Sequence, residues 1–80
     1  MDSEFSQAMH LLSVKAVLKR MEGLRMLHRR VLAGDLLSIL ALEYVLEHDP
    51  NSAVKNRASL VLKRSALKPR EGHWERHAAF

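Results

Sequence analysis

Chain breakers are rare and widely spaced in this sequence, and this spacing limits its fold more than any other feature. Glycine and proline occur only at positions 23, 34, 50, 69 and 72 of the 80 residues. Between these positions most residues favour a helix, and no strand-type alternation of apolar and polar residues persists. The sequence therefore predicts an all-α protein with three helical segments, at about residues 4–33, 35–48 and 51–68.

The first predicted helix is long for so short a chain. Asp2 or Ser3 can cap it. Gly23 costs about 1 kcal/mol inside a helix, so either the helix breaks there or another backbone approaches closely. Because the apolar residues keep one helical phase across Gly23, we expect a single helix, bent at that point and about 40–45 Å long.

The second and third segments have clear boundaries. Gly34 suits the end of a helix and Asp35 the start of the next, while Asp49 and Pro50 suit the start of the third. Segment 36–48 is apolar on nearly every side, which predicts burial on several sides and a partner to complete it. The third segment carries a main apolar seam, formed by Val54, Ala58, Val61 and Leu62. A second seam, formed by Leu60 and Leu67, lies on another side of the helix.

Charge is arranged in blocks along the chain. Residues 15–30 carry a net +5, residues 31–54 a net −4 and residues 55–70 a net +6. An acidic helix between two basic helices favours antiparallel packing of three helices. We therefore expect residues 1–68 to form one helical domain, a three-helix bundle or helical hairpin that dimerises, followed by a C-terminal tail at 69–80.

Composition excludes several classes of function. The chain has no cysteine, so disulfides, thiolate metal sites and cysteine nucleophiles are absent. No apolar run reaches the roughly 18–20 residues of a membrane span, and the acidic start Met1-Asp2-Ser3-Glu4 is unlike a signal peptide. No nucleophile–base pair and no glycine-rich phosphate loop are found. We expect a cytoplasmic protein that is not an enzyme and uses neither a cofactor nor a metal.

One local pattern is similar to a known repeat family. The run Asp49-Pro50-x-x-x-Val54-Lys55-x-x-Ala58-x-x-x-Leu62 resembles the turn and second helix of a HEAT repeat. The resemblance covers about residues 36–62 in a single copy. It implies a scaffold that binds other proteins, although HEAT arrays consist of several stacked repeats.

A second interpretation of the same region is nucleic-acid binding. The stretch from residue 54 looks like the recognition helix of a helix-turn-helix regulator, in which side chains near the start of the helix could contact base edges and later ones phosphates. Glu43, Tyr44 and Glu47 stand where the motif needs small or apolar residues. The candidate nucleic-acid-binding residues are Lys55, Asn56, Arg57, Lys63 and Arg64.

The function predicted first is that of a small adaptor, inhibitor or chaperone-like accessory protein of a phage or bacterium. It would bind a larger protein through an apolar helical surface with basic flanks. Met26 projects from the basic side of the first predicted helix, and Trp74 is an aromatic anchor in the tail. The candidate protein-binding residues are Met26, Leu60, Leu67 and Trp74, and a small DNA-binding regulator is the alternative.

Overall fold

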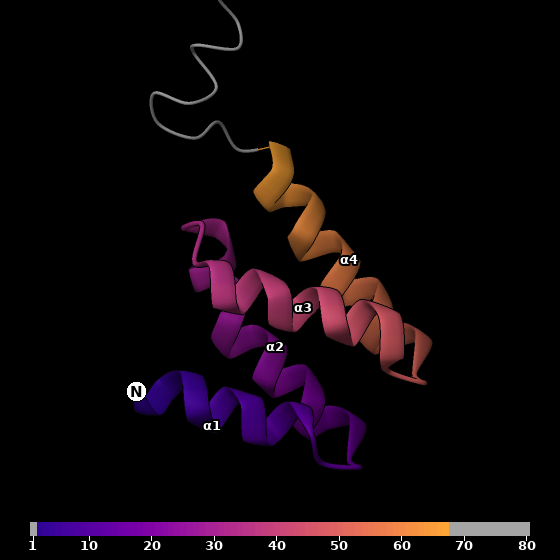
Figure 1. Ribbon diagram of the computed structural model, residues 1–80. Helices are drawn as coiled ribbons and strands as arrows, with labels where there is room; N and C mark the ends of the chain where they lie inside the picture. Colours follow the sequence, from indigo (N-terminus) through magenta and orange to yellow (C-terminus); the bar gives the residue numbers. More distant parts are fainter. Residues whose placement is uncertain (1, 68–80) are drawn as a thin grey trace, which may run out of the picture.

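A computed structural model describes residues 2–67 of the protein (Figure 1). This part of the chain forms four α-helices joined by short loops: α1 (Ser3–Leu12), α2 (Val17–Leu32), α3 (Leu36–His48) and α4 (Ser52–Leu67). The predicted all-α class is confirmed. The three-helix count and the long first helix are wrong, because residues 4–33 form two helices.

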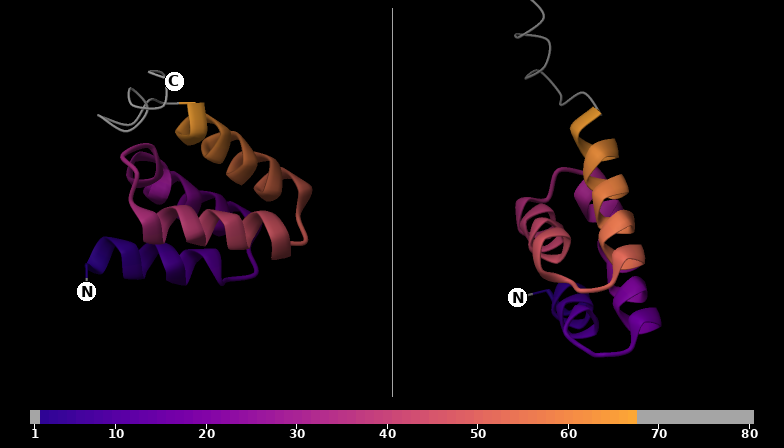
Figure 2. Two further views of the ribbon diagram at one scale, coloured as in Figure 1. Left: turned by 45° about the horizontal axis from the view of Figure 1, so that its top comes forward. Right: turned by 90° about the vertical axis from the view of Figure 1, so that its right-hand side faces the viewer.

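The four helices are arranged as two helical hairpins lying side by side. Helix α1 packs on α2, α3 packs on α4, and the hairpins meet chiefly where α2 contacts α4. Figure 2 shows the result as two layers, with α1 and α3 in one and α2 and α4 in the other. The acidic helix α3 is therefore not placed between two basic helices, and the basic helices α2 and α4 are direct neighbours.

The break that divides the predicted long helix lies at residues 13–16. Ser13 ends α1, with its backbone N–H and its hydroxyl both donating to the carbonyl of His10. Arg20 then fixes the loop by donating from Nη1 to the carbonyl oxygens of Val14 and Lys15, at 3.0 and 2.5 Å. The chain turns back here without glycine or proline because a side chain satisfies the freed carbonyls.

Gly23 lies inside α2, where the backbone of α1 approaches it closely. A Cβ atom at this position would lie 2.9 Å from the carbonyl oxygen of Ala8, 3.1 Å from Cγ of Leu12 and 3.2 Å from Cβ of Leu11. Only a residue without a side chain permits this contact. Of the two roles considered for Gly23, close approach of another backbone is confirmed, and the helix continues through it.

The side of α2 that contains Gly23 is covered by α1. Met26 and Arg30 follow Gly23 at three and seven residues, which places them on the same side of the helix. Met26 is half-buried against the core, and Arg30 forms ion pairs with Asp2, the cap of α1, and with Glu4 in α1. The hydrogen bond from the Phe5 N–H and the Arg30 guanidinium together lower the pKa of Asp2.

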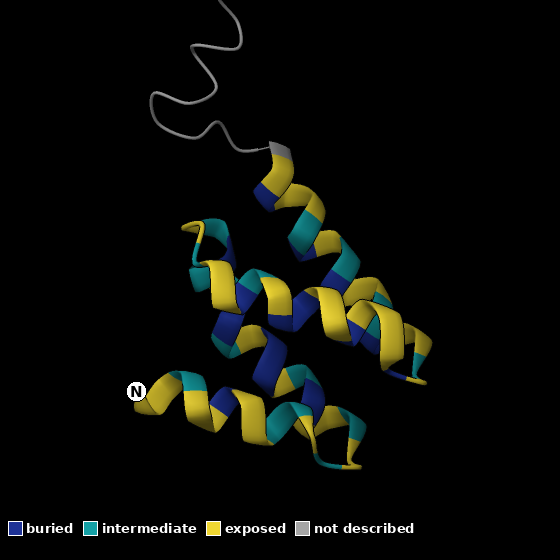
Figure 3. Ribbon diagram, viewed as in Figure 1, coloured by how far each residue is buried: buried dark blue, intermediate teal, exposed yellow. Residues whose placement is uncertain are grey.

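The apolar core lies where the two hairpins meet. The fully buried leucines are Leu24, Leu27 and Leu42, and Val31, Val54 and Val61 pack among them. Figure 3 shows these buried positions recurring along the inner sides of the helices. The predicted main seam of α4 is confirmed, since its first three members are buried and Leu62 packs against the core.

The helix ends at Asp2 and Gly34 follow the predicted signals, whereas Asp35 stands at the start of α3 without a side-chain cap bond and accepts from the Ser38 hydroxyl instead. Asp2 caps α1 through its bond from the Phe5 N–H, and Gly34 has a φ of 87° between α2 and α3. Asn51, rather than Asp49, caps α4, because its side-chain oxygen accepts from the N–H groups of Ala53 and Val54.

Among the described residues, no helix is long and apolar enough to cross a lipid bilayer.

Gly23→Ala tests the close approach of α1. Alanine favours the helix by about 1 kcal/mol, but the added methyl meets a backbone oxygen that must move. We expect a net loss of about 1–2 kcal/mol in the free energy of unfolding, measured by urea titration. The matched variant Gln7→Ala, at an exposed position of α1, should change it little. A stabilised Gly23→Ala protein would contradict this packing.

Asp2→Asn tests the ion pairs that hold α1 on α2. Asparagine remains a good helix cap, so the substitution removes the charge alone. Because the folded pKa of Asp2 lies below its ordinary value of 3.8, the carboxylate stabilises the fold above about pH 4, and this contribution is lost as the pH falls through the lowered pKa. We expect lower stability than wild type at pH 7 and equal stability in acid, measured by thermal unfolding. A difference that does not change with pH would contradict the assignment.

Candidate functional site

A buried ion pair joins the two hairpins. Arg20 on α2 donates from Nε to Oδ2 of Asp49 at 2.7 Å and from Nη2 to Oδ1 at 3.2 Å. Both residues are nearly inaccessible, at 9% and 8% exposure. Asp49 also accepts the backbone N–H of Asn51 at 2.9 Å. One guanidinium therefore connects the α1–α2 loop to the turn between α3 and α4.

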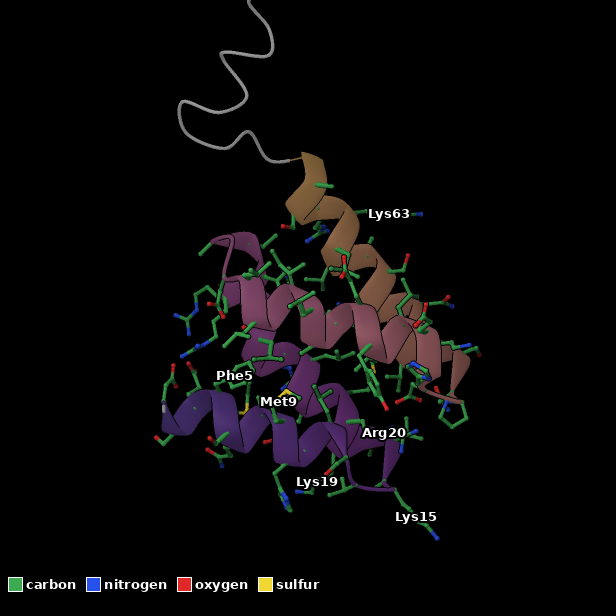
Figure 4. All side chains as sticks on the ribbon, viewed as in Figure 1. Phe5, Met9, Lys15, Lys19, Arg20 and Lys63 are labelled. Atoms are coloured by element: carbon green, nitrogen blue, oxygen red, sulfur yellow. The ribbon has the colours of Figure 1, made fainter. Side chains whose placement is uncertain are left out.

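A groove runs beside this ion pair, between the end of α1 and the second half of α3. Its volume is about 370 Å³, and its walls are mainly apolar. Met9, Leu12 and Val14 line one side, Ala41 and Tyr44 the other, and Arg20 and Asp49 lie at one end. In Figure 4, Met9 and Phe5 extend from α1 toward the other helices. The groove can accept apolar side chains of a second molecule.

An exposed apolar stripe continues from the groove along α3. Four large residues are exposed by half or more: Leu36 at 65%, Leu37 at 59%, Leu40 at 50% and Tyr44 at 65%. At 100° per residue they span about 100° of the helix, on the side away from the core. Figure 3 shows exposed positions recurring along α3. Segment 36–48, which the sequence predicts to need a partner to complete its burial, thus leaves one defined apolar surface, called here the α3 stripe.

The two layers carry opposite charge. Helices α1 and α3 contain acidic residues and no lysine or arginine. Helices α2 and α4 together carry nine lysines and arginines and a single acid, Glu22. Glu43 lies at one edge of the α3 stripe, about 20° around the helix from Leu36, and Glu47 follows one turn later at the C-terminal end of the stripe. One edge of the exposed apolar surface is therefore acidic, and the lysines and arginines lie on the opposite layer, apart from Lys15 of the α1–α2 loop, which lines the groove.

Basic side chains from α2 and α4 meet at a small cleft. Arg25 and His28 on α2 and Arg57 on α4 line it, together with Met21, Leu24 and Val61, and its volume is about 90 Å³. Arg29 lies one turn beyond Arg25, and Arg64 two turns beyond Arg57, on the same sides of their helices. This set of residues (Arg25, His28, Arg29, Arg57 and Arg64) is called here the basic face.

The protein-binding residues predicted from the sequence do not form one surface. Met26 is half-buried under α1, which gives it an intramolecular contact that the sequence did not reveal. Leu60 is 46% exposed on α4, away from the α3 stripe. The side chain of Leu67 and all of Trp74 lie outside the described residues. The sequence prediction of protein-binding residues missed the four members of the α3 stripe, Leu36, Leu37, Leu40 and Tyr44. The apolar pattern on nearly every side of their segment was the feature that could have identified them.

The predicted nucleic-acid-binding residues divide between two sides of α4. Arg57 and Arg64 belong to the basic face. Lys63 lines a separate groove of about 410 Å³ with Ile39, Glu43, Leu46 and Leu62. Lys55 lies about 160° around the helix from Arg57, and Asn56 about 100°. Arg25, His28 and Arg29 were missed because they come from another helix, which only the tertiary structure places beside α4.

Comparisons with known proteins add no family. No family model, no curated protein and no solved structure matches this chain.

The variants Arg20→Met and Asp49→Asn test the ion pair between the hairpins. Removing one partner of a buried pair typically costs about 3–5 kcal/mol, because the other charge is left buried. We expect each single variant to lose stability in urea unfolding and the double variant to lose at least about 1 kcal/mol less than the sum. Lys19→Met, at an exposed neighbouring position, serves as the control. Strictly additive losses would show that the two groups do not interact.

Proposed function

We propose that this protein is a small, non-enzymatic interaction module that holds an amphipathic helix of a partner protein on the α3 stripe. The observation that carries the proposal is the exposure of Leu36, Leu37, Leu40 and Tyr44 on one side of one helix. A soluble domain of this size seldom leaves so many large apolar residues together without a binding role. Helix-in-groove binding uses such a surface, with anchors that recur every three or four residues.

Charge indicates the kind of helix that fits. The layer formed by α1 and α3 carries Glu4, Glu43 and Glu47 and no lysine or arginine. A partner helix with leucine-type anchors and lysine or arginine at its edges would match both the apolar stripe and its acidic border. The adjoining groove, with Met9 on its wall, offers room for one large anchor beyond Tyr44. Two stacked helical hairpins are also the arrangement of scaffold repeats, which supports a binding role.

The homodimer expected from the sequence stays a prediction. The α3 stripe is the surface that a second copy would cover, in competition with a partner helix. Sedimentation equilibrium of the wild type and of Leu40→Asp separates the cases, because a dimer through α3 would become monomeric in the variant. A wild-type monomer leaves the stripe free for a partner.

The experiment uses a synthetic amphipathic peptide of about 20 residues with leucines at helical spacing and lysines at the edges. Titration is followed by amide chemical shifts and by fluorescence anisotropy. We expect shifts along α3 and around Met9, and at least a tenfold weaker affinity, about 1.4 kcal/mol, for Leu40→Asp. The matched variant Leu60→Asp has similar exposure, 46% against 50%, but lies on α4 and should bind normally.

Two results would reject the proposal. The first is binding that Leu60→Asp abolishes and Leu40→Asp does not, which would place the protein-binding surface on α4. The second is equal binding of a peptide with glutamates in place of the edge lysines, which would show that the acidic border has no role. Circular dichroism of both variants checks that the fold is retained.

A further inference from the structure

The basic face is built from two helices that the core places side by side. Arg57 meets Arg25 and His28 at the cleft, and nearer the ends of both helices the Ser65 hydroxyl donates to the Val31 carbonyl at 3.1 Å. Contacts in this order mean that α2 and α4 run in the same direction. Arg29 and Arg64 therefore both lie beyond the cleft, toward the same end of the layer.

Arginines dominate this face, and they are free to bind. Arg25, Arg29, Arg57 and Arg64 are all exposed, and none of them takes part in an ion pair within residues 2–67. By contrast, Arg20 and Arg30 are held by Asp49 and by the acids of α1. The single acid of α2 and α4 is Glu22, which lies 4.0 Å from Lys19. The face thus has cationic groups without ion-pair partners among residues 2–67.

We propose that the basic face binds the phosphodiester backbone of a nucleic-acid duplex, with Arg25, His28 and Arg57 around one phosphate. The cleft of about 90 Å³ suits a group of that size. Arginine presents a planar fork of donors that matches phosphate oxygens in a bidentate manner. Arg29, about 6 Å further along α2, and Arg64, about 10 Å further along α4, extend the contact to neighbouring phosphates.

A duplex fits this face better than other anionic partners. Binding of single strands relies on aromatic side chains among the basic ones, and the described part of α2 and α4 contains none. Membrane-surface helices insert a broad apolar side, but here the apolar sides of α2 and α4 are used in the core. Among the described side chains of this layer, this leaves Leu18 and Leu60 as the large exposed apolar residues. A duplex carries one negative charge per roughly 1.7 Å of its axis, which suits two parallel rows of arginine.

The site differs from a recognition helix in the major groove. The proposed contacts come equally from α2 and α4 and are all to the backbone, so binding is independent of base sequence. It is also separate from the α3 stripe, which lies on the other layer. A protein with both surfaces would bring a partner protein to nucleic acid.

The test compares two double variants that remove the same charge. Arg25→Gln with Arg57→Gln empties the cleft of its arginines, while Lys15→Gln with Lys63→Gln removes two lysines that point away from the molecule in Figure 4. Binding to a fluorescent DNA duplex of about 20 base pairs is measured by anisotropy between about 50 and 200 mM salt. A single strand of the same length and anionic lipid vesicles are measured alongside.

We expect the wild type to bind the duplex more tightly than the single strand or the vesicles. The arginine double variant should bind at least tenfold more weakly, with a slope of log K against log salt that is smaller in magnitude by about 2. The lysine double variant should change affinity less than threefold. The double variant Arg29→Gln with Arg64→Gln, at two exposed positions, should lose an intermediate amount of duplex affinity. It provides a second measurement if the first pair of substitutions alters the fold.

Three outcomes would overturn the proposal. They are no duplex binding at about 50 mM salt, equal losses in the arginine and lysine variants, and preference for single strands or vesicles. Binding of the amphipathic peptide should be unchanged in the arginine variants. The two surfaces are thereby tested independently, and failure of one does not imply failure of the other.

Discussion

The ion pair between Arg20 and Asp49 determines how the two hairpins are joined. Its guanidinium bonds the carboxylate of Asp49 in the second hairpin and the carbonyls of Val14 and Lys15 in the loop of the first. Every nitrogen of the side chain is used, and no described buried side-chain polar atom is left without a partner. A buried charge is costly unless it is paired in this way, so the α3–α4 turn must lie against the start of α2.

Close packing at small residues brings neighbouring helices together, in addition to the ion pair between the hairpins. Gly23 and Ala58 are each the seventh residue of a 16-residue helix, α2 and α4 respectively, and both are buried. A small residue at this place lets a neighbouring helix approach, as the 2.9 Å distance at Gly23 demonstrates for α1. Once α1 lies on this side of α2, Met26 is covered and Arg30 meets Asp2 and Glu4. The first hairpin is thus held by close packing at Gly23 near its middle and by the ion pairs of Arg30 at the end away from the loop.

Sequence alone could predict the helical class, most helix ends and the core of α4, because these depend on local spacing. It could not predict the break at residues 13–16, since Ser13-Val14-Lys15-Ala16 contains no breaker and the carbonyls there are satisfied by Arg20 from the next helix. The same error made Met26 look exposed. Of the two candidate surfaces, one could also be predicted from the sequence and the other could not. The α3 stripe could be anticipated from an excess of apolar residues in one helix, whereas the basic face depends on α2 and α4 lying together.

The segregation of charge between the layers has an energetic cost, because it places like charges on neighbouring helices. Placing two basic helices side by side is unfavourable in itself, and no described ion pair joins α3 to α4 to offset it. The apolar contact between α2 and α4 and the bond from Ser65 to Val31 hold them together despite this repulsion. Solvent and salt screen part of the repulsion among Arg25, Arg29, Arg57 and Arg64, and anions lying over them would reduce it further. Binding of a polyanion would therefore stabilise the fold as well as occupy the face, since a ligand that binds the folded state alone shifts the equilibrium toward it.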